Sequence, residues 1–470
     1  MSVKKGSEAE VSILSAAFEG KGFGKLNDRA CFVKNTAPGD IARVRIIKKR
    51  KGYYEGQLLE LLEKGPERVE PVCKHAEVCG GCTWQHVSYD EQLRFKRQHV
   101  EDHIHRIGGL REVVPNPTLA APDTLHYRNK MEYSFGDRRW LTREEIESGV
   151  EFKDKDVAAG MHAPGRFDRI LNLEECFLQG PVSYEILDFV RTYALEHDIP
   201  SFNPIKHEGF IRNVMVRNGH HTGDLMVNFV TYQDDMDVME PLKDALLKRF
   251  PQVTTVVNNV NDTKSPSSEG RFEHVLHGPG YITEKMGSNT FRIDANTFFQ
   301  TNTLQAERLY QTAKDFAEIK PDDLVFDLYC GVGSLTLFVA DAAREVVGIE
   351  LNPVSVVNAK ENAERNEVAN CAFETGDMKD VFTDKFIKKY GKPDVIITDP
   401  PRAGMHPDVI QTLNELAVDR LVYVSCNSAT MARDLAELNK VYDIIEVQPV
   451  DMFPQTYHIE TVAKLKRKSS

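Results

Sequence analysis

The chain has 470 residues, of which 41% are hydrophobic and 28% are charged. This composition is typical of globular proteins, and the length predicts roughly three domains. The mean hydropathy is −0.40, and no apolar run approaches the ~20 residues that a membrane helix needs. Because the first residues also lack a secretory signal pattern, we expect a cytoplasmic protein without a membrane partner.

The net charge of −12 argues against nucleic acid as a partner if only the whole chain is considered, because phosphate binding depends on Lys and Arg. The charge is unevenly distributed, however. Residues 1–66 hold 13 basic and 8 acidic residues, and basic residues crowd into 43–51, just before Tyr53 and Tyr54. Positive charge beside exposed aromatic rings is typical of an RNA-binding module. The same pattern also fits the solvated face of a β-hairpin.

Two domains are predicted before residue 291. Short alternating strands with glycine-rich turns fill residues 8–62 and predict a small β-barrel of the OB type, so residues 1–66 are the first domain. Helices are predicted over 89–107 and 236–249, among strands without a regular repeat. We interpret residues 67–290 as a central α+β domain.

Residues 291–470 change character, because strands and helices alternate from about residue 303 onward. Alternation at this spacing predicts an α/β domain with a doubly wound, Rossmann-like parallel sheet. Ligands of such sheets bind beyond the carboxyl ends of the strands. Five residues at predicted strand ends should therefore converge on one crevice: Asp327, Glu350, Asp377, Asp399 and Cys426.

The eight cysteines include a dense group, Cys73, Cys79 and Cys82, with the spacing C-x5-C-x2-C. Disulfides are not expected in a long chain without secretion signals, and three thiolates on one loop indicate a metal. A structural zinc site usually combines two C-x2-C knuckles, whereas an iron–sulfur cluster takes four thiolates, the fourth of which can be distant. Cys176 is the available fourth ligand. We favour an iron–sulfur cluster, with zinc and ordinary thiols as alternatives.

The segment DLYCGVGSLTL indicates a nucleoside ligand. Gly331 and Gly333 follow a buried strand and allow a ligand to approach the backbone at a helix start. The dinucleotide pattern G-x-G-x-x-G is not met, because Thr336 stands at its third position. Glu350 ends the next strand, where a carboxylate can bind ribose hydroxyls. Together these residues favour S-adenosylmethionine over a dinucleotide; a tight structural turn is the alternative.

Two later segments carry candidate reactive groups. In DPPR, the prolines stiffen the turn, which holds Asp399 and leaves Arg402 free to meet an anion. Cys426 stands at a strand end beside a helix start, a position that lowers the pKa of a thiol and makes it nucleophilic; a buried, inert cysteine is the alternative. His458 and Glu460 are candidate bases, or simple surface charge.

Four motifs in this order resemble the RNA uracil-5-methyltransferase family, whose members form 5-methyluridine in ribosomal or transfer RNA. They are FFQTN (298–302), DLYCGVG (327–333), SCNSATMARD (425–434) and DMFPQTYHIE (451–460). Residues 8–62 also resemble a TRAM domain, residues 127–136 resemble the family's central domain, and the cysteine spacing resembles its 4Fe–4S site. The resemblance covers nearly the whole chain.

The chain departs from the family pattern in two places. Between Cys82 and Cys176 lie 93 residues, a separation that an insertion at 140–156 lengthens. Ser334 and Ser428 stand where relatives often carry other residues, and we expect neither serine to touch the chemistry.

The resemblance implies a set of site residues. Cys426 would be the nucleophile and Glu460 the base. S-adenosylmethionine would be held by Gln300, Tyr329, Glu350 and Asp399, with Asp377 assisting. The 4Fe–4S cluster would be held by Cys73, Cys79, Cys82 and Cys176.

These roles imply a mechanism. The Cys426 thiolate adds to C6 of a flipped-out uracil, C5 takes the methyl group, and Glu460 removes the C5 proton. We expect 23S ribosomal RNA as the substrate, because the TRAM-like and cysteine segments resemble the rRNA-modifying branch; transfer RNA is the alternative. A non-catalytic iron–sulfur RNA-binding protein and a zinc-stabilised RNA-binding module are the alternatives from other classes. We expect a monomer without an obligate protein partner.

Overall fold

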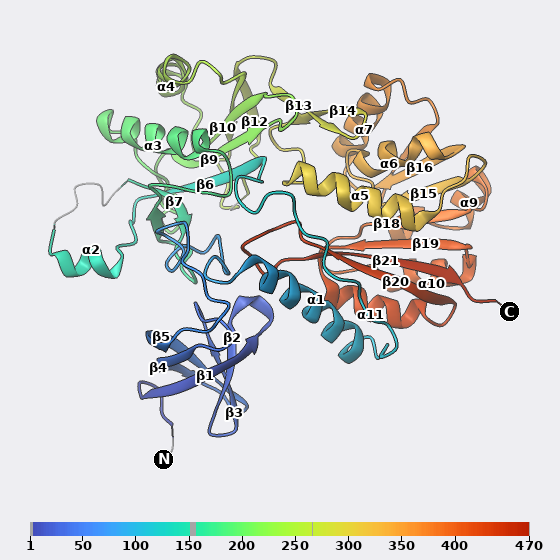
Figure 1. Ribbon diagram of the computed structural model, residues 1–470. Coiled ribbons are helices and arrows are strands. Elements are labelled where there is room, and N and C mark those ends of the chain that lie inside the picture. Colours follow the sequence, from blue (N-terminus) through green and yellow to red (C-terminus); the bar gives the residue numbers. More distant parts are fainter. Residues whose placement is uncertain (1–2, 151–156, 266, 470) are drawn as a thin grey trace.

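The first five strands of the computed structural model close into a barrel (Figure 1). They are β1 (Glu8–Ala16), β2 (Gly22–Leu26), β3 (Arg29–Val33), β4 (Ile41–Lys49) and β5 (Tyr53–Glu63). Their order around the barrel is β1-β2-β3-β5-β4, with β3 and β5 parallel. Alternate residues point inward and form a small core, which confirms the predicted OB-like barrel. The structure describes residues 3–150, 157–265 and 267–469 of the chain.

The basic stretch of the barrel is partly neutralised by acidic residues on neighbouring strands. The pairs are Arg43–Glu60 at 2.8 Å, Arg45–Glu8 at 3.1 Å and Lys48–Glu55 at 2.7 Å. The expectation that Tyr54 is exposed is wrong, because its side chain is only 3% exposed and belongs to the barrel core. Tyr53, one residue earlier, points the other way, since successive side chains of a strand alternate between its faces.

The segment that follows Cys82 connects the barrel to the rest of the molecule through hydrogen bonds. The indole N–H of buried Trp84 donates to the carbonyl oxygen of Gly20 at 3.2 Å, and a ring nitrogen of His99 lies 3.2 Å from the carbonyl oxygen of Ala16. His99 belongs to α1 (Tyr89–Arg106), whose residues Val100 and Ile104 pack in the core of the C-terminal sheet.

The middle of the chain forms a seven-stranded sheet in the order β12-β11-β10-β9-β6-β7-β8. Its strands are β6 (Lys130–Gly136), β7 (Ala158–His162), β8 (Ile170–Asn172), β9 (Ile211–Asn218), β10 (Leu225–Thr231), β11 (Thr255–Val260) and β12 (Phe272–His277). Two helices, α3 (Pro181–Glu196) and α4 (Met236–Arg249), contribute to its core. The insertion contains α2 (Arg143–Ser148), and its residues 151–156 lie outside the described residues.

The C-terminal sheet has the order β17-β16-β15-β18-β19-β21-β20, with the first five strands parallel (Figure 1). Its strands are β15 (Leu324–Leu328), β16 (Glu345–Glu350), β17 (Cys371–Thr375), β18 (Val395–Thr398), β19 (Arg420–Ser425), β20 (Tyr442–Val450) and β21 (Glu460–Arg467). Its helices are α5 (Thr303–Ala317), α6 (Ser334–Val339), α7 (Pro353–Arg365), α8 (Met378–Val381), α9 (Asp384–Tyr390), α10 (Pro407–Leu416) and α11 (Ser428–Leu438). This arrangement confirms the Rossmann-like α/β fold.

The hairpin of β13 (Tyr281–Met286) and β14 (Asn289–Asp294) packs with the C-terminal domain. Phe291 and Ile293 lie in the core formed by α5 and β15. The expected boundary between residues 290 and 291 therefore falls inside β14. Short 3-10 turns occur at Phe18–Gly20 and Ala340–Ala342, and none of the helices in the described ranges is long and apolar enough to cross a bilayer.

A buried ion pair joins α1 to the segment before β21. The ammonium of Lys96 lies 2.5 Å from the carboxylate of Asp451, and both side chains are 0% exposed. The hydroxyl of Tyr89 donates to the same carboxylate at 3.0 Å, and Lys96 also donates to the carbonyl oxygen of Phe453 at 3.1 Å. The pair depends on both partners, because removal of one leaves the other charged and buried.

We therefore predict that Lys96→Met lowers the free energy of unfolding by about 3–5 kcal/mol, measured by urea denaturation. The double variant Lys96→Met/Asp451→Asn should recover part of the loss, because the orphaned carboxylate is gone. Lys440→Ala is the matched control: Lys440 lies 2.6 Å from Glu437, but the two side chains are 66% and 54% exposed. The Lys440→Ala variant should lower the free energy of unfolding by at most ~1 kcal/mol. Equal effects of Lys96→Met and Lys440→Ala would contradict the importance of the buried pair.

Candidate active site

The parallel strands of the C-terminal sheet end at one edge, and the candidate residues follow these ends. The register pairs Leu328 with Ile349 and Thr398, and Thr398 with Tyr423. Asp327 and Glu350 therefore stand at neighbouring strand ends, and Asp399 and Cys426 follow the next two strands. This register brings together the groups that reasoning from strand ends predicted.

The glycine-rich turn is open in front of Gly331. Its φ is +56°, and a Cβ added there would meet no atom within 4 Å. Its N–H donates to Glu350 at 3.1 Å, and a second bond from the N–H of Asn352 at 2.8 Å fixes this carboxylate. Gly333 serves packing instead, because a Cβ there would approach the ring of Phe373 to 3.1 Å. The turn thus leaves space for a ligand beside a fixed acceptor.

Two buried aspartates line the strand ends behind this turn. Burial raises the pKa of Asp327 to about 7, against a bond of 2.6 Å from the hydroxyl of Thr336. Burial and the nearby Asp327 carboxylate raise the pKa of Asp399 to about 7 as well. Near neutral pH, both groups therefore exchange protons readily.

The structure adds Tyr310 to the site, which the sequence did not indicate. Its hydroxyl lies 2.8 Å from the hydroxyl of Ser334. Burial raises the pKa of Tyr310, Asp399 and Asp327 add to this rise, and Ser334 and Gln300 oppose it. These four groups therefore lie near its hydroxyl. Ser334 thus contacts Tyr310, and the expectation that neither serine touches the chemistry stays a prediction. Sequence spacing alone could not have predicted the contact of Tyr310 with Ser334, because Tyr310 lies on a helix whose pattern indicates only packing in the core.

Ser428 and Asp377 lie further from these groups. Ser428 bonds to His103 of α1 at 2.9 Å. Asp377 caps α8 by accepting the N–H of Lys379 at 3.3 Å. Burial, with the Asp377 carboxylate adding to it, raises the pKa of Tyr329 to about 12, so Tyr329 lies beside Asp377.

The thiol of Cys426 lies among two carboxyls and one guanidinium. Burial, with smaller contributions from Glu460 and Asp399, raises its pKa to about 11, and Arg402 opposes this rise. The expected lowering by a helix start is wrong. The cap of α11 is the next residue, Asn427, whose side chain accepts the N–H of Ala429, and burial outweighs any favourable effect of the helix. The thiolate therefore needs Arg402 or a bound cation.

The pKa values of the two candidate bases are shifted in opposite directions. Glu460 is 5% exposed, and burial and Asp399 raise its pKa well above the ordinary value while Arg402 opposes them. Burial, with Arg402, Lys96 and Arg128 adding to it, lowers the pKa of His458 to about 4. His458 is thus neutral near pH 7, and Glu460 is a strong base once it is ionised.

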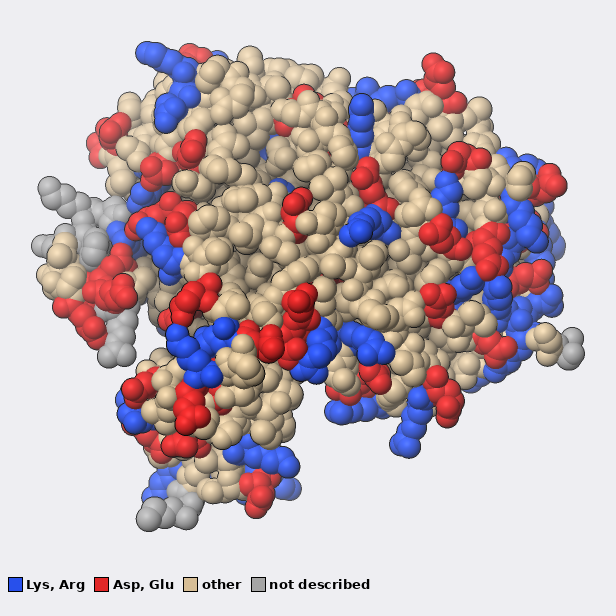
Figure 2. All heavy atoms as spheres, in the orientation of Figure 1, with Lys and Arg blue, Asp and Glu red and all other residues tan. Residues whose placement is uncertain are grey.

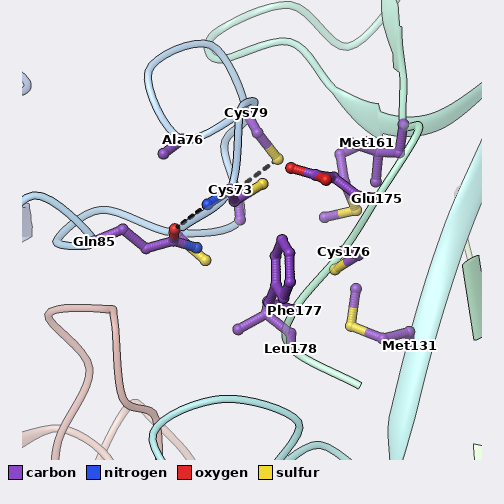
Figure 3. Close-up of a pocket in the computed structure, with 13 residues that line it drawn as sticks. Cys73, Ala76, Cys79, Gln85, Met131, Met161, Glu175, Cys176, Phe177 and Leu178 are labelled. Carbon is purple, nitrogen blue, oxygen red and sulfur yellow. Dashed lines mark hydrogen bonds between the residues drawn. The ribbon is translucent and has the colours of Figure 1, made fainter. Parts of the chain in front are cut away.

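The four predicted cluster cysteines line one pocket. In Figure 3, the sulfurs of Cys73, Cys79 and Cys176 face a common space, with the carboxylate of Glu175 beside Cys79. Burial raises the pKa of each of the four thiols, to about 11 for Cys79 and about 12 for Cys82.

The side chains of this pocket are not arranged around a single metal ion. Within the described ranges, no group of three or more His, Cys, Asp or Glu side chains is drawn together tightly enough for a metal ion. A tetrahedral zinc site holds its sulfurs within ~4 Å of one another, and these thiols do not converge in that way. The four thiols line one pocket, and the 4Fe–4S cluster stays a prediction.

Comparisons with known proteins identify the family. The family model described as tRNA (Uracil-5-)-methyltransferase matches residues 280–468, and that of the TRAM domain matches residues 2–59. An uncharacterized RNA methyltransferase of Chlorobaculum tepidum is 43% identical over 99% of this chain and 97% of its own. A second one, of Bacteroides thetaiotaomicron, is 42% identical over 96% and 99%.

The chain belongs to the RNA uracil-5-methyltransferase family. The crystal structure of Pyrococcus abyssi tRNA (uracil-54, C5)-methyltransferase in complex with S-adenosyl-L-homocysteine covers 97% of this chain and 99% of its own, with a TM-score of 0.76 and 29% identity. The protein is thus an S-adenosylmethionine-dependent RNA uracil-5-methyltransferase, as the four motifs predicted.

The raised pKa of Asp327 predicts a pH dependence of stability. In the folded chain this carboxyl keeps its proton up to pH about 7, whereas in the unfolded chain it ionises near pH 4. Between these values the folded state holds a proton that the unfolded state lacks, so stability falls as pH rises, by up to ~1.4 kcal/mol per pH unit. Asp327→Asn should flatten this fall, measured by urea unfolding at pH 5, 6 and 7 (roughly the window that the two pKa values define).

The control is Asp244→Asn, which replaces a carboxyl that is 73% exposed and should leave the slope as in the parent chain. An unchanged slope in Asp327→Asn would show that the buried carboxyl is already ionised in the folded protein.

Proposed function

We propose that this enzyme methylates C5 of a uridine through a covalent bond between Cys426 and C6 of the base. The observation that carries the proposal is the grouping of Cys426, Glu460 and Arg402 at the edge of the sheet where the open glycine turn also lies. A nucleophile, a buried carboxyl and a cation are the groups that this chemistry needs.

The steps follow from the properties of these side chains. Deprotonated Cys426, with Arg402 as its nearest cation, bonds to C6 and moves the C5=C6 electron pair toward C5 and O4. S-adenosylmethionine, when bound, would supply an electrophilic methyl group to C5 and leave as S-adenosylhomocysteine when its S–CH3 bond breaks. Glu460 then takes the C5 proton, the C5=C6 bond re-forms, and the C6–S bond breaks to return the thiolate. The raised pKa of Glu460 suits this step, because it makes the ionised carboxylate a stronger base.

The residues that we assign to S-adenosylmethionine surround the open turn. Glu350 is fixed to accept ribose hydroxyls, and Gln300 and Asp399 lie on the side where Tyr310 and Ser334 meet. Tyr329 belongs to the turn, and Asp377 lies near it. Base flipping is required, because a stacked uracil cannot reach the thiol.

We propose 23S ribosomal RNA as the substrate, on the resemblance of the TRAM and cysteine segments to the rRNA-modifying branch. Transfer RNA is the second candidate. It is favoured by the likeness to the Pyrococcus abyssi enzyme, which acts on uracil 54 of tRNA according to its description.

The covalent route predicts different outcomes for the two reactive residues. Cys426→Ala cannot bond to C6, so neither adduct nor methylated RNA should form. Glu460→Gln keeps the nucleophile but cannot take the C5 proton, so methylated RNA should remain bound to Cys426 through denaturing electrophoresis. Sequencing of the RNA trapped from total RNA should identify 23S rRNA fragments; recovery of tRNA alone would assign the enzyme to the second candidate.

Asp380→Asn is a matched carboxyl control, because Asp380 lies on α8, outside the proposed chemistry; it should turn over without trapping RNA. RNA that carries 5-fluorouridine at the target should trap the parent enzyme, because fluorine cannot leave as a proton. Methylation by Cys426→Ala at the parent rate would refute the covalent route.

We also propose that Cys73, Cys79, Cys82 and Cys176 hold a 4Fe–4S cluster. Four thiols that surround one pocket support this assignment, and a cluster bound there would join the loop of 73–82 to the distant Cys176. Cys426 does not line this pocket, so we assign the cross-link a structural role.

Anaerobically purified protein should therefore be brown and contain about four irons per chain. Cys176→Ser should lower the iron content and the visible absorbance, whereas Cys371→Ser, which removes a half-buried thiol of β17 outside the pocket, should leave both unchanged. Stoichiometric zinc without iron in such a preparation would refute the cluster.

A further inference from the structure

Three aromatic side chains form a row across the outer face of the barrel. The ring of Phe32 lies 5.8 Å from that of Phe23 and 5.7 Å from that of Tyr53, between centroids. Phe23 and Phe32 are direct partners across β2 and β3, and Tyr53 lies on β5, the other neighbour of β3. We call Phe23, Phe32 and Tyr53 the aromatic row. All three side chains are partly exposed.

The aromatic row points away from the barrel core. Its sequence neighbours Cys31, Val33 and Tyr54 are buried inside the barrel, so the alternation of a strand turns Phe32 and Tyr53 outward. The barrel core is built from other side chains: Val11, Ile13, Cys31, Val33, Ala42, Val44, Ile46 and Tyr54. Large rings on an outer face are thus not needed to close the barrel, and a contiguous row of partly exposed rings indicates an interaction surface.

The surroundings of the aromatic row are basic. The ammonium of Lys48 lies 6.0 Å from the centre of the Tyr53 ring and 2.7 Å from Glu55. Lys48, and to a smaller extent Lys21 and Lys34, lower the pKa of Glu55, so three ammonium groups gather around one carboxylate. Figure 2 shows one face of the molecule, on which basic and acidic side chains are interspersed.

We propose that the aromatic row is a stacking platform for unpaired bases of the RNA substrate, with the surrounding lysines facing its phosphates. The inference rests on the proposed RNA substrate and adds a place and a form of RNA to it. In OB-type barrels the face of strands 2 and 3 is the one that binds oligonucleotides. Bases in a duplex already stack on one another, whereas single-stranded bases are free to stack on aromatic rings.

The test measures binding on a Cys426→Ala background, so that catalysis does not enter the result. The probes are a 12-nucleotide single-stranded RNA and a blunt RNA duplex, each titrated over a range of salt concentrations (a length of roughly the size that one OB barrel covers). Phe32→Leu keeps apolar area but removes the flat ring. It should weaken single-strand binding about 5- to 150-fold without changing the salt slope, because no phosphate contact is lost. Duplex binding should change little.

Three further variants separate stacking from charge and from misfolding. Phe32→Trp should restore single-strand binding, because it returns a flat ring. Lys34→Gln should weaken both probes and flatten the salt slope by about one counterion. Tyr53→Leu repeats the test if Phe32→Leu fails to fold, as judged by its thermal unfolding.

Equal single-strand affinity of Phe32→Leu and the parent, or an equal loss for both probes, would overturn the inference. Binding by a protein in place of RNA would appear as such an unchanged affinity. The proposed function fails separately, through methylation by Cys426→Ala, so the two outcomes remain distinguishable.

Discussion

The arrangement of the reactive groups depends on the buried contact between α1 and the segment that joins β20 to β21. Lys96 and Asp451 form its centre at 2.5 Å. One helical turn earlier, the side chain of Gln92 donates to the side chain of Gln455 at 3.0 Å and accepts its backbone N–H at 2.9 Å. The backbone N–H groups of Thr83 and Trp84, next to the last cluster cysteine of the loop, donate to the carbonyl oxygen of Gln455. Barrel, cysteine segment and catalytic sheet thus meet on the stretch that leads to Glu460. Glu460, the proposed base, directly follows the connection between β20 and β21. Such a connection needs tertiary contacts, because a loop without them does not hold a side chain to a fraction of an ångström.

The second constraint is electrostatic. Asp327, Asp399 and Glu460 share a buried region with the thiol of Cys426, and each carboxylate raises the pKa of a neighbour. Low dielectric makes several negative charges there costly, so the ligand-free site holds protons. A cationic ligand reverses this balance, because positive charge favours thiolate and carboxylates alike. S-adenosylmethionine carries a positive sulfonium, so its arrival would favour the ionised forms of Cys426 and Glu460, the proposed nucleophile and base.

Reasoning from sequence worked where periodicity and strand ends determine the outcome. The alternation of strands and helices predicted the Rossmann-like sheet, and parallel strands place Asp327, Glu350, Asp399 and Cys426 at one edge by necessity. It failed where the result depends on the direction of side chains. Tyr54 was expected to be exposed and is buried, and the pKa of Cys426 is raised rather than lowered. The contact of Tyr310 with Ser334 joins residues of two helices. Such features are set by three-dimensional packing, and no spacing in a single sequence contains them.

An acidic chain that acts on RNA must obtain affinity from contacts that long-range charge does not weaken. The net charge of −12 repels phosphates at a distance, and acidic partners offset much of the basic stretch on the barrel. Stacking on aromatic rings has no such dependence, since every base presents a π-face whatever the charge of the protein. It also favours single strands, and a target in an unpaired region costs less to flip than one in a duplex. An aromatic platform would therefore choose the RNA segments in which the later chemistry is easiest, and the same contacts would supply affinity and part of the selection of the target.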